Sequence, residues 1–323
     1  MKYFRFIVWQ LGTMEIKNKK IRPAVSVIIP THNRLNLLKI ALNSVLEQTI
    51  DNIEIVIIND ASCDGTKEFL KNLSYEKVRY INNESPLGGG AARNLGIKLA
   101  TGKFIAFLDD DDTWMPDKLQ KQLEYFNADS ELVLVSCAYY SISENGTKRI
   151  VRLKKLDNPT DIYRANFLGG ASMYLVSRDS LVKYGYFDPS LRSGQDWDLL
   201  ILLSQNGKIG IINKPLVNYL EQDHVRISNN IFNTYAGLRN IYFKYKQNMP
   251  IQIANSHLCT LAFLRFGMRK KRFFSGYMLL VRFSCILNIK EQCKFLLKIL
   301  VLFFFKDYIL SSRKKFTINS KLK

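Results

Sequence analysis

The sequence has few of the residues that build disulfide, zinc and nucleophilic sites. Its five cysteines are odd in number, scattered and without CxxC spacing, so we expect reduced cytosolic thiols. Only three histidines occur, and no Ser-His-Asp set is suggested. A GxxxxGK[ST] sequence is absent, and no GxGxxG follows the first predicted strand. The sequence therefore excludes a P-loop and disfavours a dinucleotide-binding site.

Long apolar runs are also missing. No stretch approaches the ~18 uncharged apolar residues of a membrane-spanning helix. The opening residues, "MKYFRFIVWQLGTM", are basic and apolar but too short for a cleaved signal peptide to be expected. Met14 precedes a polar stretch and is an alternative start of translation, so residues 1–23 are interpreted as an N-terminal extension.

Positive charge is concentrated at one end of the chain. Residues 230–323 hold 18 of the 47 Lys and Arg but only two of the 28 acids, Glu291 and Asp307. The remaining residues are nearly balanced in charge. This asymmetry predicts a near-neutral body over residues 24–229 and a basic, helical region over 230–323, with different partners.

Strands and helices alternate through the first part of the body. Apolar, β-branched runs predict buried strands at 24–30, 52–60, 77–83 and 103–109. Helical patterns separate them, and one places Leu38, Ala41, Leu42 and Val45 on a single face. This alternation indicates a Rossmann-like α/β fold with a mostly parallel sheet flanked by helices.

Polar residues follow three of these strands: "PTHNR", "NDAS" and "DDDD". Ligands bind at the carboxyl ends of the strands in such sheets, so these segments are expected to converge. If residues 109–112 continue extended, alternate aspartates point the same way. One pair could then hold a hard divalent cation, Mg²⁺ or Mn²⁺, with substrate phosphates completing its shell. The alternative is a solvated turn with helix-capping acids before Pro116.

Four segments in order resemble the motifs of family 2 glycosyltransferases with a GT-A fold. They are "VSVIIPTHNR", "IVIINDASCDGT", "GGGAARNLGIKLATGKFIAFLDDDD" and "GYFDPSLRSGQDWDLLILL". The resemblance spans residues 24–228, and the aspartate run matches the D-x-D element of the family. It implies a GT-A nucleotide-sugar-binding and catalytic domain over 24–229, of the bacterial surface-polysaccharide type.

The resemblance also implies site residues, each with a structural alternative. Nucleotide-sugar contacts are expected at Pro30, Thr31, Asn33 and Arg34, in the loop after the first strand, and further along at Asp60, Arg93, Asp109 and Asp110. The alternative for the loop is a plain strand-ending turn. The alternative for Asp60 is an Asx-turn and for Arg93 a surface arginine. Backbone N–H groups at a helix start, together with a guanidinium, suit the oxygens of a diphosphate.

Metal ligands are expected at Asp111, Asp109 and His224, with Arg226 as a loop contact. Which of Asp109 and Asp111 dominates the coordination stays open. The alternative for His224 and Arg226 is an ordinary basic loop.

Asp196 matches the catalytic base, and its alternative is a helix N-cap. Gln195 departs from the family pattern, in which glutamate is common at this position. Asp198 is a fallback base, and Trp197 either lies under an acceptor sugar or packs in the core.

The function implied is metal-dependent sugar transfer with inversion, from a nucleotide-diphosphate sugar, UDP-sugar being favoured. The acceptor would be a glycan or a polyprenyl-linked oligosaccharide in surface-polysaccharide synthesis, such as capsule or O-antigen. The alternative is a non-catalytic nucleotide-sugar-binding or scaffold protein. A nucleotidyltransferase is disfavoured because "PTHNR" is not its glycine-rich, basic signature.

The basic region alternates cations with aromatic clusters, as interfacial helices do. We expect it to lie on the cytoplasmic membrane surface, which makes the protein cytoplasmic and peripheral to the inner face. A solvated helical appendage is the alternative. A nucleic-acid partner is disfavoured because no binding module is recognisable.

Overall fold

The computed structural model describes residues 22–154, 158–221 and 231–267. Within them, one sheet contains nine strands: β1 (Val25–Thr31), β2 (Ile53–Asn59), β3 (Val78–Asn82), β4 (Phe104–Phe107), β5 (Thr113–Trp114), β6 (Leu132–Ser143), β7 (Lys148–Val151), β8 (Leu175–Ser177) and β9 (Lys208–Glu221).

Helices connect these strands. They are α2 (Leu35–Leu46), α3 (Thr66–Lys71), α4 (Gly89–Leu99), α5 (Lys118–Ala128), α6 (Arg178–Tyr184), α7 (Gln195–Ser204), α8 (Ile231–Tyr245) and α9 (Ile251–Gly267), with short 3-10 helices η1 (Pro159–Tyr163) and η2 (Ala171–Met173). No helix among the described residues is both long and apolar enough to cross a bilayer.

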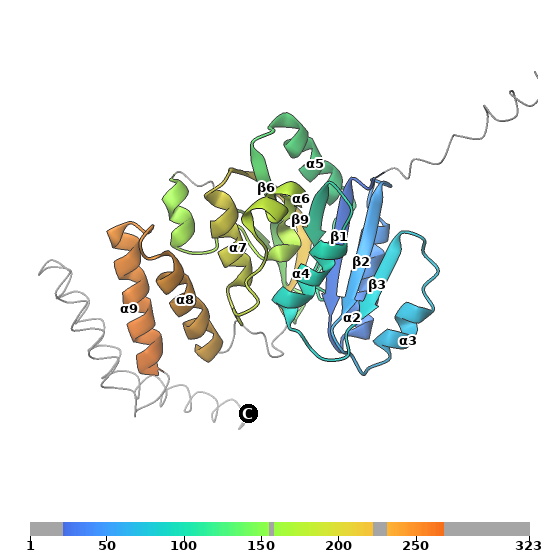
Figure 1. The fold of residues 1–323 in the computed structure, drawn as a ribbon, viewed down its shortest axis with the longest axis horizontal. Coiled ribbons are helices and arrows are strands. Elements are labelled where there is room, and N and C mark those ends of the chain that lie inside the picture. Colours follow the sequence, from blue (N-terminus) through green and yellow to red (C-terminus); the bar gives the residue numbers. More distant parts are fainter. Residues whose placement is uncertain (1–21, 155–157, 222–230, 268–323) are drawn as a thin grey trace, which may run out of the picture. The chain divides into compact units, whose positions relative to one another are not determined.

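The strand order is β3-β2-β1-β4-β8-β6-β9-β5, with β7 paired to β6. The pairs among β1, β2, β3 and β4 are parallel, whereas β8 is antiparallel to both β4 and β6. This mixed, mostly parallel α/β sheet confirms the predicted fold class. Because β1, β2 and β4 run in one direction, their carboxyl ends lie at one edge of the sheet (Figure 1).

The core follows the apolar runs of the sequence. Every residue of β2 and β4 is buried, and β1 is buried at six of its seven positions. The predicted face of α2 is buried through Leu38, Ala41, Leu42 and Val45. Helix α4 packs on β1 and β2 and lies in front of the sheet in Figure 1. A Cβ on Gly96 would collide with Ile28, so this glycine allows α4 to approach β1 closely.

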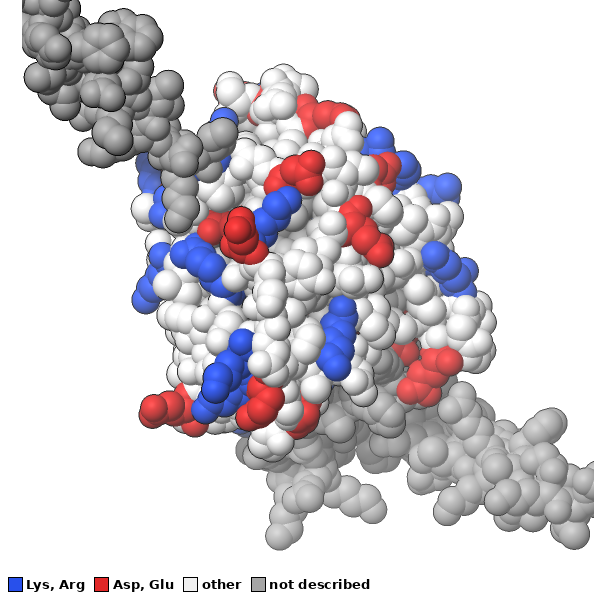
Figure 2. Space-filling view, turned by 90° about the vertical axis from the view of Figure 1, so that its right-hand side faces the viewer, with Lys and Arg blue, Asp and Glu red and all other residues white. Residues whose placement is uncertain are grey.

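The chain divides into two compact units, one ending at Tyr245 and the other beginning at Lys246. Helix α8 lies within the first unit, and the division of the chain at residue 230 stays a prediction. On the face of the molecule nearest β3, Lys and Arg are interspersed with Asp and Glu (Figure 2), as a near-neutral body predicts. Most of the basic region lies outside the described residues, so its expected membrane contact stays a prediction.

Candidate active site

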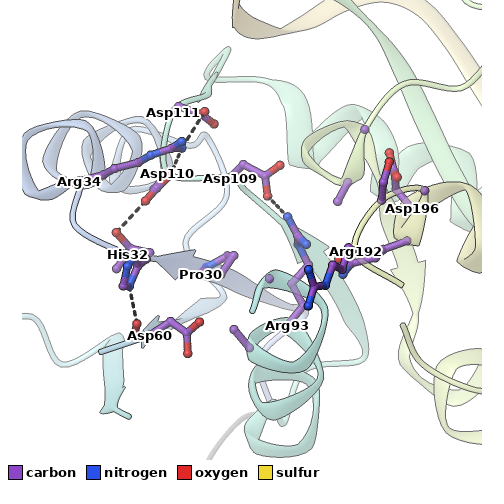
Figure 3. Close-up of a pocket in the computed structure, with 18 of the residues that line it drawn as sticks. Pro30, His32, Arg34, Asp60, Arg93, Asp109, Asp110, Asp111, Arg192 and Asp196 are labelled. Atoms are coloured by element: carbon purple, nitrogen blue, oxygen red, sulfur yellow. Dashed lines mark hydrogen bonds and ion pairs between the residues drawn. The ribbon is translucent and has the colours of Figure 1, made fainter. Parts of the chain in front are cut away.

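A cleft opens at the carboxyl ends of β1, β2 and β4. It encloses about 460 Å³, within the size range of small-molecule sites. The residues that line it are Pro30, Thr31, His32, Arg34, Asp60, Gly89, Ala92, Arg93, Asp109, Asp110, Asp111, Gly170, Ala171, Arg192, Ser193, Gly194, Gln195, Asp196 and Tyr219. Figure 3 shows side chains from distant parts of the sequence facing one another here. The predicted convergence of polar strand ends therefore occurs.

The aspartate run forms a turn. The amide of Asp112 donates to the carbonyl of Asp109 at 3.0 Å, which reverses the chain before β5. The condition of an extended run, under which alternate aspartates would point the same way, is therefore not met. Asp109, Asp110 and Asp111 line the cleft, whereas Asp112 is buried at 2% exposure and does not line it. Burial, with Asp111 and Asp109 nearby, raises the pKa of Asp112 well above its ordinary value. At Asp110 and Asp112, which are 6% and 2% exposed, this turn is buried and not solvated.

Arg34 links the loop after β1 to the aspartate run. Its Nη1 lies 3.0 Å from Oδ1 of Asp110 and 2.9 Å from Oδ2 of Asp111. Thr31 donates its hydroxyl to Oδ2 of Asp110 at 2.7 Å. Burial raises the pKa of Asp110 to about 6, although Thr31 and Arg34 favour the ionised form. Two segments predicted as separate parts of the site are thus joined directly.

Arg93 lies in the first turn of α4 and pairs with Asp109. Burial is the largest single effect and lowers the pKa of Arg93, but the carboxylates of Asp109, Asp196 and Asp110 together raise it above its ordinary value. Its Nε is buried without a hydrogen-bond partner among the described residues. Arg93 is therefore a fixed cation inside the cleft, and its interpretation as a surface arginine is wrong.

Asp60 holds the loop that precedes α4. Its Oδ1 accepts from the amide of Leu87 at 2.8 Å, and its Oδ2 accepts from that of Gly88 at 2.8 Å. Its backbone carbonyl lies 2.6 Å from Nδ1 of His32. Both residues line the cleft, so His32 is a lining residue that the sequence prediction missed although it lies within "PTHNR".

Asn33 does not line the cleft, unlike its neighbours Thr31, His32 and Arg34. Its backbone is left-handed with φ of 54°, a conformation that asparagine tolerates. Its side-chain oxygen accepts from the amide of Cys63 at 2.7 Å. Asn33 therefore ties two loops together beside the site.

Asp196 is the second residue of α7 and lines the cleft. The N-cap is Gly194, with φ of 78°, so the alternative that Asp196 caps the helix is wrong. Asn166 donates to Oδ2 of Asp196 at 3.2 Å. Burial raises the pKa of Asp196, an effect that Arg93 opposes. A carboxylate with a raised pKa in a cleft is suited to accept a proton.

The residues around Asp196 have structural partners. Asp198 does not line the cleft, is 1% exposed and pairs with Lys244 of α8. Trp197 donates its indole N–H to the carbonyl of Ile162 at 2.7 Å and does not line the cleft. Asp198 is thus poorly placed as a fallback base, and Trp197 packs inside the domain.

Gln195 and Arg192 both line the cleft beside Asp196. The amide of Gln195 donates to the carbonyl of Leu191 at 2.5 Å. Arg192 was not predicted as a site residue. Its position in "SLRSGQDWD", three residues before Gln195, was the available signal.

The predicted metal ligands Asp109 and Asp111 lie at the cleft, whereas His224 and Arg226 lie outside the described residues. Among the described residues, no three His, Cys, Asp or Glu side chains are grouped as a metal site. Mg²⁺ and Mn²⁺ use one or two carboxylates and take further ligands from phosphates and water. Two carboxylates at the edge of the cleft therefore fit such a cation.

The chain is similar to known glycosyltransferases. Residues 26–185 match the family model described as Glycosyl transferase family 2. An uncharacterized glycosyltransferase of Rickettsia bellii is 33% identical over 204 residues, 59% of this chain but 28% of the relative's length. The chain thus spans less than a third of that relative.

Two relatives carry more specific names. The amylovoran biosynthesis glycosyltransferase AmsB of Erwinia amylovora is 31% identical over 209 residues, 60% of this chain and 68% of AmsB. The putative teichuronic acid biosynthesis glycosyltransferase TuaG of Bacillus subtilis is 27% identical over 261 residues, 77% of this chain and 98% of TuaG.

Solved structures share the fold. TarS 1–349 of S. aureus in complex with UDP-GlcNAc has a TM-score of 0.60 at 19% identity, covering 83% of this chain and 77% of that one. The mannosyltransferase PcManGT of Pyrobaculum calidifontis, in complex with GDP-Man and Mn²⁺, has a TM-score of 0.57 at 18% identity, covering 97% and 90%. From its sequence motifs, its sheet and these matches, the chain belongs to glycosyl transferase family 2.

Proposed function

We propose that this chain transfers a sugar from a nucleotide-diphosphate sugar, favouring UDP-sugars, to a hydroxyl of a glycan or lipid-linked oligosaccharide. The observation that carries this proposal is the meeting of Asp109, Arg93 and Asp196 in one cleft. A guanidinium suits a diphosphate, carboxylates suit a divalent cation, and a carboxylate of raised pKa suits proton abstraction. The names of AmsB, TuaG and the TarS complex support the same reaction class.

The two ends of the cleft have different roles in the proposed reaction. At one end, Pro30, Thr31, Arg34 and Asp60 surround the expected position of the nucleoside. Arg93 stabilises negative charge on the leaving diphosphate, because it is held rigidly by Asp109. At the other end, Asp196 accepts the proton of the acceptor hydroxyl as it attacks the anomeric carbon, and one such displacement inverts that centre.

Asp109 and Asp111 would hold Mg²⁺ or Mn²⁺, which when bound neutralises charge on the diphosphate. The Mn²⁺ and GDP-Man in the complex of PcManGT support this assignment. His224 and Arg226, which follow β9 in the sequence, are proposed to contribute as well.

The acceptor is proposed to belong to bacterial surface-polysaccharide synthesis, in line with the relatives named for amylovoran and teichuronic acid. A basic region after α8 would hold the protein on the inner face of the cell membrane, where polyprenyl-linked acceptors lie. The alternative of a non-catalytic nucleotide-sugar-binding scaffold has the Gln195 departure as its support.

The test is a panel of UDP- and GDP-sugars assayed for metal-dependent hydrolysis and transfer, with the parent and with Asp196→Asn. Asp196→Asn should lose at least about a hundredfold in turnover while nucleotide binding by calorimetry is retained. Asp179→Asn is the matched control, since Asp179 is exposed on α6 outside the cleft. Parental turnover in Asp196→Asn would refute the base, and binding without turnover in the parent would support the scaffold.

A further inference from the structure

Arg192 is a cation of the cleft that has no counter-ion in the described part of the chain. Arg34 pairs with Asp110 and Asp111, and Arg93 pairs with Asp109. For Arg192, no ion pair or hydrogen bond to a described residue is found, although its side chain lines the same cleft. An arginine facing a binding cleft without an acidic partner is available for an anion of the ligand.

The loop that carries Arg192 is held in place on both sides. The amide of Leu191 donates to the carbonyl of Asp188 at 3.2 Å, and Gln195 returns a hydrogen bond to the carbonyl of Leu191. On the outer side, α8 packs so closely that a Cβ on Gly237 would lie 2.7 Å from the carbonyl oxygen of Ser193. The backbone that carries Arg192 is therefore held in place, while its side chain is exposed in the cleft.

Gln195 is uncharged, so it adds no negative charge to this end of the cleft. Its amide donates to the carbonyl of Leu191, which a glutamate at this position could not do when ionised. Asp109 and Asp196 are acids of the same cleft, but Asp109 pairs with Arg93, and the strongest favourable charge interaction of Asp196 is also with Arg93. The neutral residue at 195 thus leaves Arg192 unneutralised.

Arg192 also lies at the sugar end of the cleft. In Figure 3 its side chain extends from the side of Asp196 toward Arg93, and His32 and Asp60 lie beyond Arg93 in this view. The proposed function, on which this step rests, puts the nucleoside near Asp60 and the reacting hydroxyl near Asp196. A group of the bound substrates that contacts Arg192 therefore belongs to the transferred sugar or to the acceptor.

We propose that Arg192 forms a subsite for an anionic substituent, a carboxylate or phosphate, carried by the transferred sugar or by the acceptor. A guanidinium binds both groups through paired N–H donors, so the chemistry is shared by the two sources. Arg192 is then a specificity-determining residue, and Gln195 preserves its charge for the substrate.

Two binding experiments distinguish the sources. In the donor arm, calorimetry compares UDP, UDP-glucose and UDP-glucuronate, with GDP and GDP-mannose as nucleotide controls. In the acceptor arm, ligand-observed NMR with saturating UDP compares glucose with glucuronate and glucose 6-phosphate. The proteins are the parent, Arg192→Met, Arg192→Lys and Gln195→Glu, with Arg152→Met as control because Arg152 is exposed outside the cleft.

In one of the arms the parent should prefer the anionic compound, and Arg192→Met should weaken that compound about ten- to a hundredfold. Arg192→Lys should retain part of the preference, Gln195→Glu should reduce it, and Arg152→Met should keep it.

If Arg192→Met weakens the binding of UDP by the same factor as the binding of the anionic sugars, Arg192 contacts the diphosphate and the proposal is overturned. Binding of UDP-sugars without any Arg192-dependent charge preference in either arm would overturn it too, while leaving the proposed function intact. A parent that binds neither UDP nor GDP compounds would refute both.

Discussion

Lys244 Nζ lies 2.8 Å from Oδ2 of Asp198 and so joins α8 to the helix that carries Asp196. Tyr245 donates its hydroxyl to Oδ1 of the same carboxylate at 2.9 Å. The Asp198 side chain is 1% exposed whereas that of Lys244 is 40% exposed, so solvent weakens the pair from one side only. The segment expected to begin a separate appendage thus supports the active site.

Lys244→Met should lower the free energy of unfolding by about 1 kcal/mol, because it leaves a buried carboxylate with fewer partners. Urea denaturation of the parent and variant measures this difference. Lys98→Met, at an exposed position of α4, is the control and should change stability little. Equal stability of Lys244→Met and the parent would show that the pair does not hold α8.

Gly237→Ala should destabilise the protein by at least about 1 kcal/mol, although the same change in most helix interiors is stabilising. The added Cβ would lie 2.7 Å from the carbonyl oxygen of Ser193, which is backbone and cannot rotate away. Turnover should fall as well, since Ser193 precedes α7. A more stable variant in urea denaturation would contradict the close packing.

Lys118 makes stability depend on pH. It is fully buried, and burial lowers its pKa from 10.5 to about 8. Between these values the unfolded chain binds the proton that the folded protein has lost, so stability rises with pH. The parent should gain about 2 kcal/mol more than Lys118→Met between pH 7 and pH 9.5. Urea denaturation at both pH values measures this, and parallel curves would refute the lowered pKa.

Asp111→Ala should weaken nucleotide-sugar binding in the presence of Mg²⁺ or Mn²⁺, about tenfold or more, and leave metal-free binding less affected. Calorimetry with and without the metal separates the two effects. Asp51→Ala is the control, since the side chain of Asp51 is fully exposed and outside the cleft. Equal affinities with and without metal in parent and variant would remove Asp111 from the metal site.

Local patterns predicted the parallel half of the sheet well. The buried face of α2 and the apolar strands can be recognised from the spacing of apolar residues within each segment. Leu38 and Val45 could therefore be predicted as buried without knowing which residues they contact. The polar strand ends followed from the same logic, because parallel strands bring their carboxyl ends together.

Partners distant in the sequence could not be predicted in this way. Whether the aspartate run is extended or turned was open in the sequence; it turns, and its acids pair with Arg34 and Arg93. Asp198 lies two residues after Asp196 and was therefore an alternative base. Its carboxylate instead binds Lys244 and Tyr245, which follow more than forty residues later, and so has a structural role. The position of Arg192 close to Gln195 in the sequence was a signal, but its lack of an ion pair with a described residue is visible only in the fold.

The interleaved strand order has a consequence for synthesis on the ribosome. Strand β8 is inserted between β4 and β6, and β5 pairs with β9, which follows it by about a hundred residues. A nascent chain that has emerged only through α6 would present the long edge of β6 and an unpaired β5, because β9 covers both. Such an edge can pair with other chains until β9 arrives. During that interval the nascent chain is most prone to aggregate and most able to bind chaperones. Slower translation after α6 should therefore lower the yield of soluble protein.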